Sequence, residues 1–139
     1  LEVANNKLAS VPESLSNLTS IQRLVIGTNK ITSRPHSIGS LTQMTLLDFR
    51  SNECKELPVE LCDCNALKKI DMSANLVTML PWEMYHLENL EQLDVDRNPL
   101  IIPPGSEVAK GCKAMLKYLK DKEKIGKEQG NKISGLGLQ

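Results

Sequence analysis

Asparagine and proline recur through this sequence at one common interval of twenty-three residues, which constrains the fold more than any other feature. Each proline follows an asparagine by six positions. The members are Asn6, Asn29, Asn52, Asn75 and Asn98, then Pro12, Pro35, Pro58, Pro81 and Pro104. An unbroken internal period of this length is typical of a solenoid, in which each repeat is one turn of chain. The sequence therefore predicts about four and a half stacked turns over residues 1–104.

Apolar side chains keep the same register as the asparagines. They stand five and three residues before each one: Leu1, Leu24, Leu47, Ile70 and Leu93, then Val3, Ile26, Phe49, Met72 and Val95. Apolar residues at alternate positions indicate a short strand with one buried face. Stacked turns would join these strands into a parallel sheet on the concave side, with short helical or 3-10 segments on the convex side.

The asparagines themselves have a structural interpretation. A side-chain amide at the corner of each turn can bond backbone groups that the turn leaves unpaired in the interior. Leaving such a group unbonded costs roughly 1–3 kcal/mol. We therefore expect Asn6, Asn29, Asn52, Asn75 and Asn98 to form a ladder that stabilises the stack.

Each cycle reads LxxLxLxxNxLxxLPxxLxxLxx, and this pattern resembles the leucine-rich-repeat superfamily over residues 1–104. The Leu-Pro after the asparagine is similar to the cytosolic subclass that includes scribble, erbin and the plant intracellular Ras-group proteins. The resemblance implies an α/β fold: a right-handed solenoid, or horseshoe, with a concave parallel sheet and a C-terminal capping helix. It also implies a cytoplasmic protein that binds another protein.

A helical pattern replaces the repeat near the C-terminus. Val108, Cys112, Met115, Leu116 and Leu119 recur at three- and four-residue steps and give one apolar stripe. We assign residues 105–125 to a helical cap, with Ser106 as its N-cap and a break at Gly111, and 126–139 to a Gly- and Lys-containing tail that is flexible or ordered by a partner. Because Leu1 already lies inside a strand, we also expect upstream repeats, or another covering for this edge.

Residues capable of catalysis or metal binding have simpler explanations. The cysteines at positions 54 and 64 occupy apolar columns, and free cysteine packs as a small apolar residue. Only His36 and His86 could supply imidazoles, and neither stands near a nucleophile. No stretch of ~18 apolar residues could span a membrane. We therefore expect no enzyme activity, no cofactor, no metal and no nucleic-acid partner.

The solvent-directed residues of the sheet are the candidate binding site, because the repeat does not fix their identity. Side chains six, four and two residues before each asparagine should point outward. With Arg97, the candidates for binding a protein on the concave face are Arg23, Val25, Leu46, Asp48, Arg50, Lys69, Asp71, Ser73, Gln92, Asp94 and Asp96. Three aspartates beside several cations predict a salt-sensitive surface for a charged protein segment.

Three functions remain open at this point. The chain could be a scaffold or adaptor, a permanent structural subunit of a large ciliary or cytoskeletal assembly, or a regulatory subunit for a small GTPase or phosphatase. Its charge is uneven, with −4 over residues 1–105 and +4 over residues 106–139. This asymmetry does not identify the partner.

Overall fold

The computed structural model describes residues 1–2, 6–7, 9–10, 13–32 and 36–135. Its sheet consists of four parallel strands in sequence order: β1 (Arg23–Val25), β2 (Leu46–Asp48), β3 (Lys69–Asp71) and β4 (Gln92–Asp94). The register advances by one repeat at every step, so that Leu24, Leu47, Ile70 and Leu93 lie side by side. The predicted parallel sheet, with one turn of chain per strand, is confirmed.

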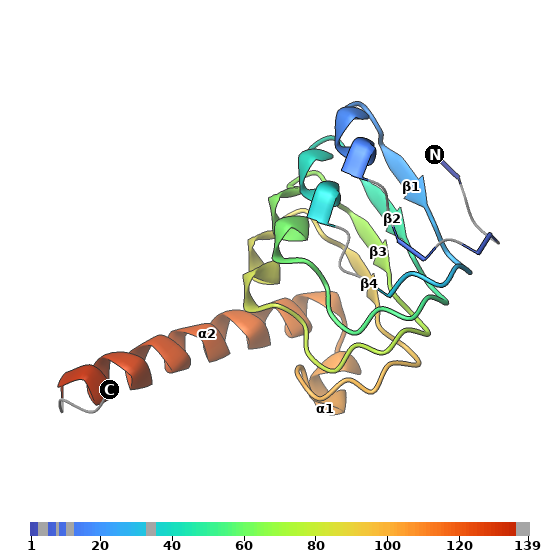
Figure 1. Ribbon diagram of the computed structural model, residues 1–139. Helices are drawn as coiled ribbons and strands as arrows, with labels where there is room; N and C mark the ends of the chain where they lie inside the picture. The colour runs from blue at the N-terminus through green and yellow to red at the C-terminus, as the bar shows by residue number, and fades with distance from the viewer. Residues whose placement is uncertain (3–5, 8, 11–12, 33–35, 136–139) are drawn as a thin grey trace.

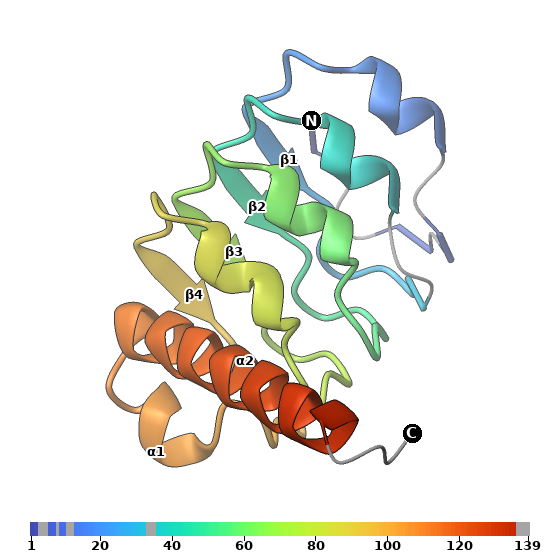
Figure 2. The same ribbon diagram turned by 90° about the vertical axis from the view of Figure 1, so that its left-hand side faces the viewer.

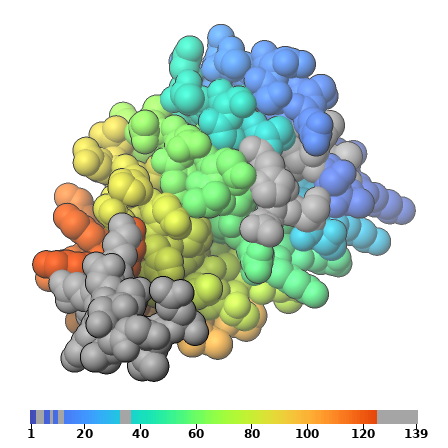
Figure 3. Space-filling model, turned by 60° about the vertical axis from the view of Figure 1, so that its left-hand side comes forward, coloured from blue at the N-terminus to red at the C-terminus, as the bar shows by residue number. Residues whose placement is uncertain are grey.

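Four short 3-10 helices lie on the opposite side of the solenoid from the sheet (Figures 1 and 2). They are η1 (Glu13–Asn17), η2 (His36–Ser40), η3 (Val59–Asp63) and η4 (Trp82–His86). Pro58 and Pro81 stand directly before η3 and η4, with φ of −69° and −64°. Proline sets the backbone for a helical turn and lacks the N–H that such a turn would leave unbonded. Figure 3 shows successive repeats as adjoining bands on this convex side.

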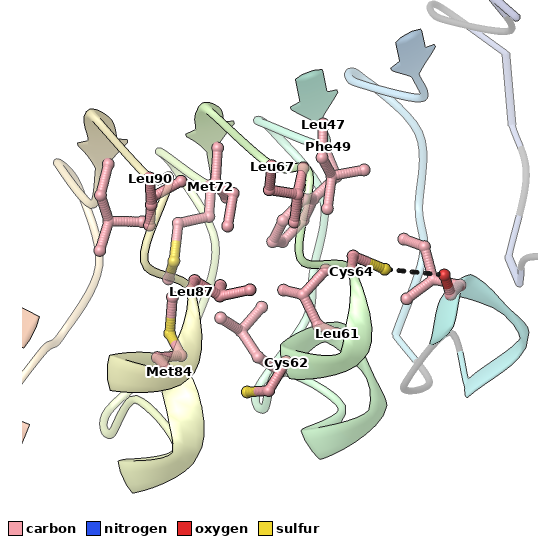
Figure 4. Close-up of a cluster of buried hydrophobic side chains, with 14 of the residues drawn as sticks. Leu47, Phe49, Leu61, Cys62, Cys64, Leu67, Met72, Met84, Leu87 and Leu90 are labelled. Carbon is pink, nitrogen blue, oxygen red and sulfur yellow. Dashed lines mark hydrogen bonds between the residues drawn. The ribbon is translucent and has the colours of Figure 1, made fainter. Parts of the chain in front are cut away.

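Aliphatic side chains fill the space between the sheet and the 3-10 helices. Leu24, Leu47 and Ile70 point inward from the strands, while Leu61 and Met84 meet them from the convex side. All five are at most 1% exposed. Figure 4 shows this packing for the third and fourth repeats. Since no turn could bury these residues alone, the core exists only through stacking.

Two helices close the C-terminal end, α1 (Gly105–Val108) and α2 (Cys112–Gly135). The predicted break at Gly111 is present, and this glycine has a φ of +105°, which side chains rarely adopt. The predicted N-cap was wrong: Pro104 precedes α1, without a side-chain cap, and Ser106 lies inside the helix. Met115 and Leu119 are 2% and 0% exposed, so α2 buries its apolar stripe in the solenoid core.

Helix α2 continues beyond residue 125, where the sequence analysis placed the start of the tail, and ends at Gly135. Glycines 126 and 130 each weaken a helix by about 1 kcal/mol. The residues between and after them include Lys127, Glu128, Gln129 and Lys132, all good helix formers. The isolated glycines at positions 126 and 130 therefore do not mark the end of the helix. Residues 136–139 lie outside the described part of the chain.

At the other end of the sheet, Leu1 and Glu2 pair with β1. The Leu1 amino group donates to the Arg23 carbonyl at 2.7 Å, and the Val25 N–H donates to the Leu1 carbonyl at 2.8 Å. Leu1 is 51% exposed. The neighbouring apolar positions Val3 and Leu8 lie outside the described residues.

Candidate protein-binding surface

The solvent face of the sheet brings the candidate side chains together in columns. One column runs through Arg23, Leu46, Lys69 and Gln92, and the next through Val25, Asp48, Asp71 and Asp94. Neighbours in a column are about 4.8 Å apart along the sheet. Arg50, Ser73 and Asp96 follow two residues after the aspartate of their own strand, at the point where the chain leaves the sheet.

These candidates differ in exposure. Those exposed to solvent are Arg23, Arg50, Lys69, Gln92, Asp96 and Arg97. Those half-buried are Val25, Leu46, Asp48, Ser73 and Asp94. Asp71 is 9% exposed, although we expected it to point freely into solvent. Exposed candidates therefore occur along the whole sheet, and Asp71 is the one candidate that is closed to a partner.

The three aspartates have a structural role that the sequence analysis missed. One carboxylate oxygen of each accepts a hydrogen bond from the backbone N–H two residues later. Asp48 accepts from Arg50 at 3.2 Å, Asp71 from Ser73 at 3.0 Å, and Asp94 from Asp96 at 3.0 Å. The Ser73 hydroxyl also donates to Asp71, at 2.7 Å. Each aspartate thus fixes the turn that follows its strand.

Arg50 reduces the negative charge in the middle of the surface. Its Nε lies 3.5 Å from Oδ2 of Asp48, and its Nη1 lies 4.0 Å from Oδ2 of Asp71, on the next strand. The Arg50 side chain is itself 58% exposed, so these pairs contribute little to stability. They do change the local charge: two of the three aspartates already have a cation beside them, while Asp94 has none within 4.0 Å among the described residues.

A groove of about 390 Å³ lies between β4 and the cap helices. Figure 2 shows the start of α2 beside β4, with α1 on the other side of α2. Lys69, Gln92, Asp94 and Asp96 line it from the sheet, together with Glu91. The cap contributes Val108, Gly111, Cys112 and Met115. The sequence analysis assigned these cap residues to closure of the core alone, although their position directly after the last repeat was a signal that they adjoin the concave face.

The asparagines connect successive turns inside the solenoid. The Asn52 amide donates to the Phe49 carbonyl at 2.8 Å and to the Ile26 carbonyl of the preceding repeat at 3.1 Å. Its oxygen accepts from the Ile31 N–H at 3.1 Å. Asn75 and Asn98 repeat this arrangement one and two turns later.

The two ends of the ladder differ from its middle. Asn29 is buried like Asn52 and Asn75, and it donates to the Ile26 carbonyl at 2.8 Å. Asn98 is half-buried, and Asn6 is exposed. Only the interior members are therefore shielded from water by a repeat on each side.

The residue before each of the last four asparagines of the ladder has a left-handed backbone. Thr28, Ser51, Ala74 and Arg97 have φ of 54°, 57°, 54° and 56°. Residues with a Cβ rarely adopt this conformation, which costs roughly 1–2 kcal/mol. The turn that places the asparagine in the interior requires it, and the four residue types share no side-chain chemistry that would have revealed it.

The four cysteines have free thiols and pack in or against the core. Burial raises the pKa of Cys54 and Cys64 to about 11, and burial together with nearby acidic residues raises that of Cys62 to about 12. Cys64 donates to the Ile38 carbonyl at 3.2 Å, the dashed line in Figure 4. No group of three or more potential metal ligands occurs among the described residues.

Comparison with known proteins supports the fold through structure alone. No protein-family model matches the sequence, and no curated protein does either. Among solved structures, a leucine-rich-repeat protein of Leptospira interrogans superposes with a TM-score of 0.73 at 29% identity, covering 79% of this chain and 28% of that one. The protein InlJ of Listeria monocytogenes gives 0.63 at 28%, covering 72% and 20%.

A plant peptide hormone receptor, RGFR1, solved in complex with RGF2, is also similar. Its TM-score is 0.60 at 33% identity, and the match covers 66% of this chain and 15% of the receptor. This chain has the leucine-rich-repeat fold: a solenoid with a concave parallel sheet, convex 3-10 segments and a C-terminal helix. It spans less than a third of the length of each of these proteins. No helix of the described part is long and apolar enough to cross a membrane.

Proposed function

We propose that this chain is a non-enzymatic protein-interaction module, a scaffold or adaptor that binds a partner protein through its concave sheet. One observation carries the proposal. Three of the four strands, β1, β3 and β4, hold exposed polar side chains in one column, Arg23, Lys69 and Gln92, and the core does not use these side chains. A repeat surface of this kind is extended, and its residues vary without cost to packing.

Similar solved proteins support the same idea. The receptor RGFR1 was solved with RGF2, and another similar structure contains PEPR1 with AtPEP1. Both structures are complexes. By analogy, we assign this chain a protein or peptide partner, recognised by the mixed charges of the concave face.

We further propose a cytoplasmic location, as in the cytosolic repeat proteins that the sequence resembles. The free thiols of Cys54, Cys62, Cys64 and Cys112 support a reducing compartment. Labelling the chain in cells and fractionating them would test this. Recovery with secreted proteins would contradict the proposed location without affecting the proposed binding surface.

The binding proposal is tested by affinity. The full chain is first used to co-purify a partner, and the complex is then remade from purified components. The variant Gln92→Lys/Asp96→Lys alters two exposed concave positions, whereas the matched variant Asn65→Lys/Glu88→Lys makes the same change of charge at two exposed convex ones. We expect at least tenfold weaker binding for the concave variant and less than a twofold change for the convex one. The reverse order would overturn the proposal.

A second function, the permanent subunit of a larger assembly, is favoured by exposed apolar side chains after the last strands. Leu76, Met79 and Ile101 are 46%, 48% and 68% exposed. Such side chains at neighbouring positions are unfavourable in water unless a partner covers them. Size-exclusion chromatography of the isolated chain separates the two functions. A stable monomer at high concentration favours the adaptor, and association relieved by Met79→Gln/Ile101→Gln favours the assembly subunit.

A further inference from the structure

We propose that the groove between β4 and the cap helices is the anchoring point for the partner, and that it takes a basic side chain next to an apolar one in an extended segment. This inference rests on the proposed concave-face function. It names the part of that face that makes the decisive contact and the chemistry of the segment that fits it.

The shape of the groove supports a side-chain anchor. Its volume, about 390 Å³, lies within the range of about 300–1,000 Å³ that is usual for ligand pockets. It is the junction of two different structural parts, the last strand and the cap. A segment lying along the concave face would therefore meet a wall here, whereas the solvent face of β1 to β3 has no cap beside it.

The charge of the groove selects a cation. Glu91, Asp94 and Asp96 contribute three carboxylates, and Lys69 is the only lining residue with a positive charge. Asp94 uses Oδ1 to accept from the Asp96 N–H at 3.0 Å. Of the ion pairs between described residues, none involves these three carboxylates.

The contrast with the middle of the sheet strengthens this point. There Arg50 already lies beside Asp48 and Asp71, so a second cation would find its partners occupied. The aspartates of β2 and β3 therefore share one cation from within the chain, whereas Asp94 on β4 has no cation within 4.0 Å among the described residues. A partner's guanidinium in the groove would repeat at Asp94 the arrangement that Arg50 supplies one strand earlier, and a guanidinium can bind a carboxylate through two hydrogen bonds.

The cap side of the groove is apolar. Val108 and Cys112 are half-buried, Met115 is buried, and a Cβ placed on Gly111 would meet no atom within 4 Å. An alkyl stem or a neighbouring apolar side chain can pack against these residues while the charged end of the basic side chain meets the carboxylates. The two walls together define the segment: basic toward β4, apolar toward the cap. Carboxylates at this density disfavour a phosphate-bearing ligand.

The test uses the full chain and three libraries of nine-residue peptides that are random except for a central Arg, Glu or Leu. We expect retention mainly of the Arg-centred library, with apolar residues enriched beside the arginine. On titration of the best Arg-centred peptide, NMR shifts should change at Asp94–Asp96 and Gly111–Met115. Retention that does not depend on the central residue, or no retention, would overturn the inference.

Variants then locate the contact. Asp94→Asn/Asp96→Asn keeps an acceptor for the Asp96 N–H and removes two charges, so we expect at least tenfold weaker binding of the Arg-centred peptide. The control Asp63→Asn/Glu88→Gln removes two convex charges and should change binding less than twofold. Lys69→Gln removes the competing cation and should tighten binding about threefold, which provides a readout that does not depend on the double variant folding.

The failures are distinguishable. Shift changes confined to β1 and β2 would overturn the groove and leave concave-face binding intact. Changes confined to η1 to η4 would overturn both.

Discussion

The side-chain amide of Asn75 donates a hydrogen bond to the Phe49 carbonyl, 3.1 Å away and one full repeat earlier in the chain. The same amide donates to the Met72 carbonyl of its own repeat at 3.0 Å, and its oxygen accepts from the Cys54 N–H at 3.2 Å. One buried side chain thus bonds the backbone of two turns. Register between repeats is fixed at this corner as well as by the strands.

Asn75→Ala should therefore destabilise the chain strongly. Asn75 is 4% exposed, so alanine would leave buried backbone groups of both repeats without partners. Each unbonded group costs about 1–3 kcal/mol, and we expect a total loss of at least ~2 kcal/mol. Urea unfolding followed by circular dichroism measures it. The control is Asn89→Ala, because Asn89 donates to the Asn65 carbonyl at 2.9 Å on the exposed surface. A loss no larger than that of the control would contradict the role of the ladder.

Backbone conformation at Ala74 gives a second prediction. Its φ of 54° is unfavourable for any residue with a Cβ. Ala74→Gly should leave the melting temperature unchanged or raise it slightly, because relief of strain offsets the greater freedom of the unfolded chain. Ala74→Val should lower stability by at least ~1 kcal/mol, since a β-branched side chain fits this conformation worst.

The matched control for Ala74 is Ala109→Gly. Ala109 has φ of −63° at the end of α1, where alanine is unstrained. Glycine there should cost about 0.5–1 kcal/mol. Equal losses at Ala74 and Ala109 in thermal unfolding would argue against strain at the turn.

Close approach of two 3-10 helices yields a third prediction. A Cβ on Gly39, in η2, would lie 2.8 Å from the Glu60 Cβ and 3.0 Å from its carbonyl oxygen, in η3. Gly39→Ala should destabilise the chain by about 1–3 kcal/mol, because the backbone of η3 must shift. At Gly105 the same Cβ meets nothing within 4 Å. Gly105→Ala should be neutral or stabilise by up to ~1 kcal/mol. Equal tolerance at both sites in urea unfolding would contradict the spacing of the convex helices.

The buried thiol of Cys64 predicts a dependence of stability on pH. Burial raises its pKa from 9.0 to about 11. Below pH 9 the thiol is protonated in both states and its contribution is complete. As pH rises toward 11 the unfolded chain ionises first, so this contribution is lost. The stability advantage of wild type over Cys64→Ala should fall by about 1.4 kcal/mol per pH unit in this window.

Urea unfolding at pH 8, 9, 10 and 11 checks the thiol prediction. Leu67→Ala serves as the control, since Leu67 is equally buried and does not titrate. Its deficit relative to wild type should stay constant across the series. If the Cys64→Ala deficit were also constant, ionisation of this thiol would have no part in alkaline unfolding.

The repeat period was enough to predict the strands, the convex segments and the place of the asparagines at the corners of the turns, because the same spacing recurs in every turn. The left-handed residues could not be predicted, since Thr28, Ser51, Ala74 and Arg97 share a backbone requirement and no chemistry. Arg50 lies beside Asp48 and Asp71, which belong to two different strands. This pairing depends on the rotamer of the Arg50 side chain, which the sequence does not specify.

The groove was missed for a related reason. Its walls come from the last repeat and from Val108 and Cys112, which the sequence analysis treated as separate parts with separate tasks. The end of α2 was predicted about ten residues too early, because isolated glycines lower helix stability without ending the helix.

The most direct test of the central claim is photo-crosslinking from single positions of the full chain in cells. A benzoylphenylalanine at Gln92, exposed on β4, probes the concave face, and one at Glu88, exposed after η4, probes the convex face of the same repeat. We predict a discrete crosslinked protein adduct from position 92 and none from position 88. An adduct from position 88 alone would contradict binding through the concave sheet.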